Sequence, residues 1–278
     1  MTHSKNLRQS QKACTLFLLQ VVLYSGISYF ARWRLPYGAR LGPLTWTFAL
    51  ADGIQAWSVG VAGLVAIVAA KGSIRDLGLQ GAAAKYFAIA CALPIAYCTA
   101  IYLPCWLSGF ASFKGPRTLF YATVATIVRL PWHVAMASGE EIGWRGALTP
   151  NLATLIGSGR AGLACGLAWA TWHYADILFF DYSVGTPWAY AIGCFTVSLV
   201  GMSVFLTWLR LAGRSVWPPA LFHGVHNAVI YGVFDRSTET DSKAALLTTE
   251  FGAGLALAAA VLGVAGWREL QRTKISLE

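Results

Sequence analysis

Residues 188–209 read WAYAIGCFTVSLVGMSVFLTWL and contain no charged side chain in 22 residues. A helix needs about 20 predominantly apolar residues to cross the hydrocarbon core of a bilayer. The apolar residues of this run do not alternate with polar ones, which favours a helix over a strand. The segment therefore predicts a membrane-spanning helix.

The same pattern recurs along the chain. Apolar residues make up 56% of the 278 residues and charged residues only 12%, whereas a soluble domain carries about 25% charged residues. This composition excludes a soluble globular enzyme, a disordered chain and a collagen-like fibre. It predicts an all-α fold, a polytopic transmembrane helical bundle of about eight spans in a single integral membrane domain over residues 1–278. The other apolar segments are residues 13–31, 44–70, 86–109, 119–137, 161–180, 216–234 and 249–267.

The distribution of Lys and Arg along the chain indicates the orientation of the protein in the membrane. The net charge is +9, but no basic run is interleaved with aromatic residues, so we expect no nucleic-acid partner. An even number of spans puts both termini on one side of the membrane. Thirteen Lys and Arg residues fall on that side and seven on the other, which predicts a multi-pass protein of the cell membrane with both termini in the cytoplasm.

Three clusters of polar residues interrupt the apolar segments. The first is Glu140-Glu141-Ile142-Gly143-Trp144-Arg145. Glu141 and Arg145 are four residues apart, so on a helix they are neighbours in the favourable order of acid before base. We expect an ion pair between them that supports the fold and leaves Glu140 available as a base. A solvated helix end is the alternative reading of this cluster.

The second and third clusters each contain a pair with one-turn spacing. Trp169 and His173 share a helix face, as do His223 and Asn227. Each pair alone is compatible with polar contacts between packed helices. Together with Glu140, they supply a base, a partner that orients water, and donors for an oxyanion. That set predicts hydrolysis.

The ordered motifs resemble those of a known family. Glu-Glu-x-x-x-Arg at Glu140–Arg145, aromatic-x-x-x-His at Trp169–His173 and His-x-x-x-Asn at His223–Asn227 are similar to the CPBP family of type II CAAX prenyl endopeptidases and bacterial Abi proteins. Residues 76–79, Asp-Leu-Gly-Leu, also look like this family. The likeness extends over about residues 119–234, which we expect to be the catalytic core.

The resemblance implies a role for each residue. Glu140 and His173 would activate water, and His223 and Asn227 would form the oxyanion hole. Glu141, Arg145 and Trp169 would support them. The cofactor is left open between none and a divalent metal such as zinc, for which Glu140, His173 and His223 are the candidate ligands. The absence of a His-Glu-x-x-His motif favours activation of water without a metal.

Three functions are compatible with such a bundle. The first is an intramembrane endopeptidase that acts on a peptide or a membrane protein within the lipid bilayer. The second is a non-catalytic membrane scaffold or a bacteriocin-immunity-type protein. The third, a transporter, predicts internal repeats, which the chain lacks. The complete set of polar residues favours the endopeptidase, with a catalytic cavity that opens toward the cytoplasmic side. The oligomeric state is left open.

Overall fold

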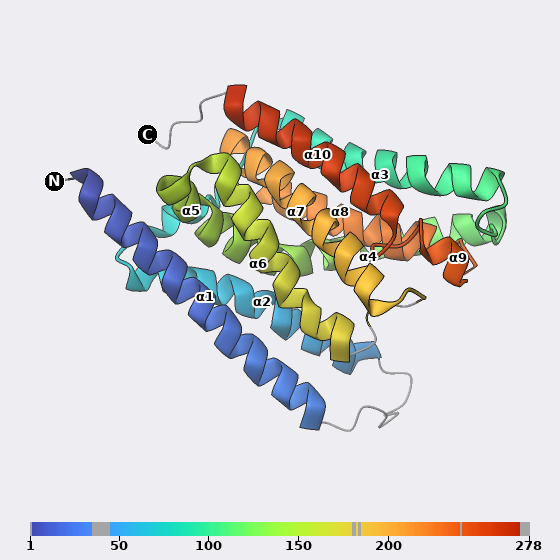
Figure 1. Cartoon of the computed structure of the whole chain (residues 1–278), viewed down its shortest axis with the longest axis horizontal. Helices are drawn as coiled ribbons and strands as arrows, with labels where there is room; N and C mark the ends of the chain where they lie inside the picture. Colours follow the sequence, from blue (N-terminus) through green and yellow to red (C-terminus); the bar gives the residue numbers. More distant parts are fainter. Residues whose placement is uncertain (1, 35–44, 180–181, 183–184, 240, 273–278) are drawn as a thin grey trace.

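The protein is a bundle of packed helices (Figure 1). The computed structural model describes residues 2–34, 45–179, 182, 185–239 and 241–272. The α-helices are α1 Thr2–Arg34, α2 Thr45–Ala69, α3 Ala84–Leu107, α4 Pro116–Glu141, α5 Thr149–Ile156, α6 Ser158–Phe179, α7 Trp188–Gly213, α8 Trp217–Val229, α9 Ser242–Ala245 and α10 Ala253–Arg272. Short helices of other types are the 3₁₀-helix η1 Ile74–Leu77 and the π-helices η2 Ile142–Leu148 and η3 Ile230–Phe234.

The all-α prediction is confirmed, because no β-strand forms within the described residues and β-structure there amounts to a single bridge between Phe113 and Thr238. The number of spans agrees only approximately. Among the described residues, five helices are long and apolar enough to cross a membrane, against the eight expected. The helices α6 and α8 are not among the five. They carry His173 and His223, and α8 is also short and continues as η3.

The two ends of the chain lie together. The first turn of α1 and the last turn of α10 are at the same end of the bundle (Figure 1). A groove at this end is lined by residues from the start of α1, the α2–η1 link, α5, the start of α6 and the ends of α7 and α10. Arg75, Arg210 and Arg214 are among its lining residues. This arrangement agrees with an even number of passes and with basic residues gathered at the end of the termini.

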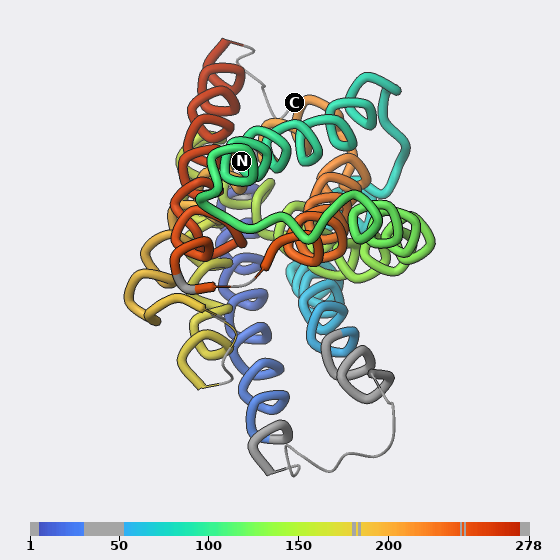
Figure 2. Tube along the Cα trace, turned by 90° about the vertical axis from the view of Figure 1, so that its right-hand side faces the viewer, coloured from blue at the N-terminus to red at the C-terminus, as the bar shows by residue number. Residues whose placement is uncertain are grey.

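Close helix crossings depend on glycine. The Gly162 and Gly166 positions of α6 contact α7 so closely that a Cβ atom there would lie 2.9 Å from Val204 Cα and 2.7 Å from Val200 Cα. On the other side of α7, a Cβ atom at Gly201 would lie 2.2 Å from the carbonyl oxygen of Ala259 in α10. Small residues at such crossings let helix backbones approach each other. The resulting layer of α6, α7 and α10 lies against α8, while α10 and α4 occupy opposite flanks of the bundle (Figure 2).

We predict that Gly201→Ala destabilises the bundle by about 1–3 kcal/mol, because the added methyl group must displace the backbone of α10. Gly193→Ala is the matched control on the same helix, since Gly193 is exposed and a Cβ atom there meets nothing within 4 Å. Thermal unfolding of the detergent-purified proteins measures both effects. Equal unfolding midpoints for the two variants would contradict the close α7–α10 contact.

Candidate active site

The two glutamates of the first motif are the last residues of α4. Their neighbour Gly139 packs against α2, where a Cβ atom would lie 2.9 Å from the carbonyl oxygen of Ala56. At Gly143, in η2, the approach is closer still, because a Cβ atom there would lie 2.4 Å from the carbonyl oxygen of Val59. The two glycines bring α4 against α2 and place the acidic pair inside the bundle. Glu141 is completely buried there, while Glu140 is half-buried.

Glu141 is held between two basic residues. Arg145 donates from a guanidinium nitrogen to Glu141 Oε1 at 2.9 Å, and both side chains are 0% exposed. His223 Nδ1 donates to the same oxygen at 3.0 Å. The ion pair expected from the sequence is therefore present, and it includes a third group from α8, 82 residues further along the chain.

Trp169 contacts most of the other site residues. Its indole Nε1 donates to Glu140 Oε2 at 2.9 Å. The guanidinium carbon of Arg145 lies 4.2 Å from the centroid of its ring, and the His223 ring meets it edge-on at 5.1 Å. A cation over an indole face is attracted by the ring quadrupole. The tryptophan thereby separates Glu140 from Arg145 while contacting both.

His173 has a defined tautomer. Its Nδ1 lies 3.0 Å from the carbonyl oxygen of Trp169, and because a carbonyl oxygen only accepts, Nδ1 carries the proton. Nε2 is then the nitrogen whose lone pair can accept a proton from water. The ring is fixed by aromatic neighbours, with Trp172 at 4.6 Å, Phe195 at 5.3 Å and Tyr182 at 6.4 Å between centroids.

The third motif lies on α8, which is pressed against α4. A Cβ atom at Gly224 would be 2.6 Å from Val134 Cα, so the two helices touch at the residue that follows His223. Asn227 is one turn beyond His223 on the same face of α8 and is half-buried. The next histidine, His226, is bonded instead to the Tyr97 hydroxyl of α3, which assigns it to helix packing.

The Asp-Leu-Gly-Leu stretch is tied to the first motif. Arg210 of α7 donates to the carbonyl oxygen of Asp76 at 2.9 Å and to that of Arg145 at 3.1 Å. Gly78 has a φ of +72°, and a Cβ atom there would lie 2.5 Å from the Arg210 guanidinium. Arg210 therefore links the η1 loop, the first motif and α7.

The candidate metal ligands do not meet as a set. Among the residues that the structure describes, no three His, Cys, Asp or Glu side chains are grouped so that they could hold a metal ion. Within the expected trio, Glu140 accepts from Trp169 and His173 bonds to the backbone, while His223 bonds to Glu141. These residues in this arrangement do not fit a metal.

The fold and the site together define a class, namely a multi-pass helical membrane protein with buried glutamates and histidines on separate helices. Residues 116–229 match the family model described as "Type II CAAX prenyl endopeptidase Rce1-like", which confirms the resemblance expected from the motifs. All three motifs lie within the matched range. The comparison with curated proteins finds no match.

Some features of the site have no signal in the sequence. The first motif continues into the π-helix η2 and the third into the π-helix η3, a helix type that is frequent at functional sites. The bond between Glu141 and His223 depends on how α4 and α8 pack.

The catalytic cavity was expected to open at the cytoplasmic end. However, Tyr182, the neighbour of His173, lines a cavity at the opposite end. Access from the end of the termini stays a prediction.

We predict that Glu141→Gln lowers the free energy of unfolding by about 3–5 kcal/mol, since it leaves Arg145 buried without its counter-charge. The matched control is Arg272→Gln, which breaks the exposed pair with Glu269 and should cost about 1 kcal/mol or less. Denaturant unfolding of both variants in detergent micelles gives the comparison. Glu141, Arg145 and His223 form a buried triad. A stable Glu141→Gln protein would show that this triad does not support the fold.

Proposed function

We propose that the protein is an intramembrane endopeptidase that hydrolyses a peptide bond with water activated by Glu140 and His173. The observation that carries this proposal is the arrangement around Trp169. Trp169 donates from its indole nitrogen to Glu140 and fixes His173 through its backbone carbonyl oxygen. Two proton acceptors from different helices are thus oriented by the same residue.

Glu140, and not Glu141, is placed to act as the base. Glu141 is engaged by Arg145 and His223 at the same oxygen, which gives it a supporting role. Glu140 has one neutral hydrogen-bond donor, Trp169. It therefore retains the capacity to accept a proton, as a general base requires.

The reaction balances with these groups alone. Glu140 takes one proton from water, which also donates a hydrogen bond to Nε2 of His173, as the water oxygen attacks the peptide carbonyl carbon and a tetrahedral oxyanion forms. Glu140 then gives this proton to the amide nitrogen as the carbon–nitrogen bond breaks. The products are a carboxylic acid and an amine, which become a carboxylate and an ammonium group by transfer of the acid proton, and Glu140 returns to its starting state.

His223 and Asn227 supply the oxyanion donors. The Nδ1 of His223 donates to Glu141, so the opposite nitrogen, Nε2, faces away from that carboxylate. The negative charge of Glu141 favours the imidazolium form, in which Nε2 also carries a proton to donate. The Asn227 amide, one turn away, is the second donor. Such donors stabilise charge that develops only in the transition state.

The family match supports this proposal and its surroundings. A type II CAAX prenyl endopeptidase-like region in a multi-pass bundle suits a peptide or membrane-protein substrate in the lipid bilayer, with no nucleic acid involved. We place the catalytic core at about residues 119–234 of a single domain that covers residues 1–278. His173 lies 15 residues after Ser158, or about 22 Å along α6, so the reaction takes place well below the membrane surface.

We predict that Glu140→Gln lowers cleavage by about 10²- to 10⁴-fold, because the amide cannot accept the proton of water. Mass spectrometry of membrane proteins from cells with the wild-type protein or the variant would identify new termini that depend on Glu140. Glu269→Gln is the control, since Glu269 lies on α10, outside the three motifs.

The unfolding midpoint of Glu140→Gln should stay close to that of the wild-type protein, because Glu140 is half-buried and has one hydrogen bond. Identical termini in wild-type and variant cells, with both proteins folded, would favour the non-catalytic scaffold or immunity role instead.

We further propose that both termini are cytoplasmic. Arg160 is exposed at the start of α6, at the end of the termini, and Lys243 is exposed on α9, at the opposite end. In a background without the exposed Cys91, Arg160→Cys should react with an impermeant thiol reagent only after the membrane is opened. Lys243→Cys should react in intact cells. The reverse pattern would invert the topology.

A further inference from the structure

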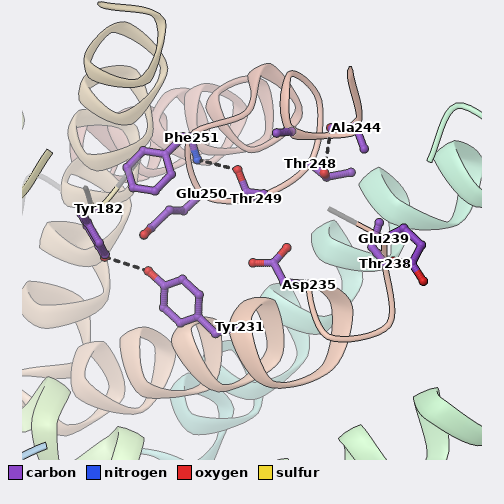
Figure 3. A pocket seen from close by; sticks show the side chains of 11 residues that line it. Tyr182, Tyr231, Asp235, Thr238, Glu239, Ala244, Thr248, Thr249, Glu250 and Phe251 are labelled. Carbon is purple, nitrogen blue, oxygen red and sulfur yellow. Dashed lines mark hydrogen bonds between the residues drawn. The ribbon is translucent and has the colours of Figure 1, made fainter. Parts of the chain in front are cut away.

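A cavity of about 320 Å³ lies at the end of the bundle opposite the termini (Figure 3). Its walls come from η3, the segment between η3 and α9, α9 itself, the segment that joins α9 to α10, and Tyr182, which lies between α6 and α7. The lining residues are Tyr182, Tyr231, Asp235, Thr238, Glu239, Ala244, Ala245, Thr248, Thr249, Glu250 and Phe251. None of them belongs to the three motifs.

One side chain separates this cavity from the proposed catalytic histidine. The Tyr182 ring is nearly parallel to the His173 ring, with an interplanar angle of 16° and centroids 6.4 Å apart. The Tyr182 hydroxyl also bonds to the Tyr231 hydroxyl at 2.9 Å. A group bound in the cavity would therefore lie next to the reacting peptide bond.

Glu250 is buried and points into the cavity. The residue is 6% exposed, and within the described part of the chain its Oε1 has no hydrogen-bond partner. Figure 3 shows its carboxylate directed at the space between Tyr182 and Tyr231, with the Asp235 carboxylate turned toward the same space. Asp235 is held from behind by the Tyr102 hydroxyl. A buried carboxylate oxygen without a donor is rare in a native fold, and a donor bound in the cavity would complete it.

The electrostatics of the cavity favour a positive ligand. The net pKa of Glu250 is raised to about 7, chiefly by burial and also by the nearby Asp235, against the opposing effects of the Tyr231 and Tyr182 hydroxyls and of His223. Burial also raises the pKa of Asp235 to about 6. Two carboxylates in one poorly solvated space repel each other. A cation between them would remove that repulsion and favour the charged form of both.

We infer that this cavity is a substrate subsite for the ammonium or guanidinium group of a basic residue in the peptide. The inference rests on the proposed endopeptidase function. Rings of Tyr182, Tyr231 and Phe251 border the carboxylates, and aromatic faces together with acids bind organic cations well. Among the described residues, no three His, Cys, Asp or Glu side chains are grouped so that they could hold a metal ion, which favours an organic cation.

The size and position of the cavity define the register of the peptide. A space of about 320 Å³ accommodates one long side chain. An extended peptide advances about 3.3–3.6 Å per residue. The ring of Tyr182, which lines the cavity, and the ring of His173 have centroids 6.4 Å apart. The basic residue is therefore one or two positions from the peptide bond that is cut.

Binding is tested first with the full-length protein in detergent, using n-butylammonium and the neutral n-butanol as probes. Wild-type protein should bind the ammonium at least about tenfold more tightly, as measured by thermal stabilisation. Glu250→Gln should remove this preference. If Glu250→Gln does not fold, Asp235→Asn takes its place and should reduce the preference. Glu269→Gln, on α10 outside this cavity, should keep it. No preference in the wild-type protein overturns the subsite.

Cleavage is tested with apolar peptides that carry one lysine at successive positions, each matched by a norleucine peptide. The wild-type protein should prefer lysine by about 10- to 100-fold in kcat/KM at one or two adjacent positions, and Glu250→Gln should abolish that preference. Cleavage without any preference overturns the subsite but keeps the endopeptidase. Ammonium binding that depends on Glu250, without cleavage of any peptide, keeps the subsite as a cation site and overturns the endopeptidase.

Discussion

The carboxylate of Glu141, shared between Arg145 and His223 inside the bundle, is the interaction on which the site depends. An unpaired charge in such surroundings would cost several kcal/mol, so α4, η2 and α8 can reach their observed packing only when all three groups meet. The same contact engages Nδ1 of His223 and leaves Nε2 to donate to the proposed oxyanion. Stability of the fold and orientation of the oxyanion donor therefore have one physical cause.

Glycine makes this meeting geometrically feasible. The triad requires α4 to lie against α2 on one side and against α8 on the other, with backbones closer than side chains allow. Gly139 and Gly143 provide the first approach and Gly224 the second. These residues sit within or beside the motifs, so the motif sequence specifies the helix contacts as well as the reactive groups.

The sequence predicts what depends on local spacing. Residues 188–209 predict α7, because a long uncharged run has few other structures available, and the i,i+4 spacing predicts the pair of Glu141 and Arg145. The partner His223 is 82 residues away, and the π-helices arise from tertiary packing, so neither has a local signal. The same holds for Trp169, whose spacing to His173 was visible but whose bond to Glu140 was not.

The charges of the site extend across the bundle toward the cavity at Glu250. Arg145, Glu141 and His223 form a chain of alternating sign, and His223 in turn acts on Glu250, beside Asp235. A positive charge on His223 therefore acts on Glu141, to which it is bonded, and on Glu250 of the cavity. A basic substrate residue in the cavity would also act on Glu250, and it would lie beside Tyr182, whose ring is stacked on that of His173. Because both positive charges act on Glu250, occupation of the cavity is coupled to the charge of the oxyanion donor.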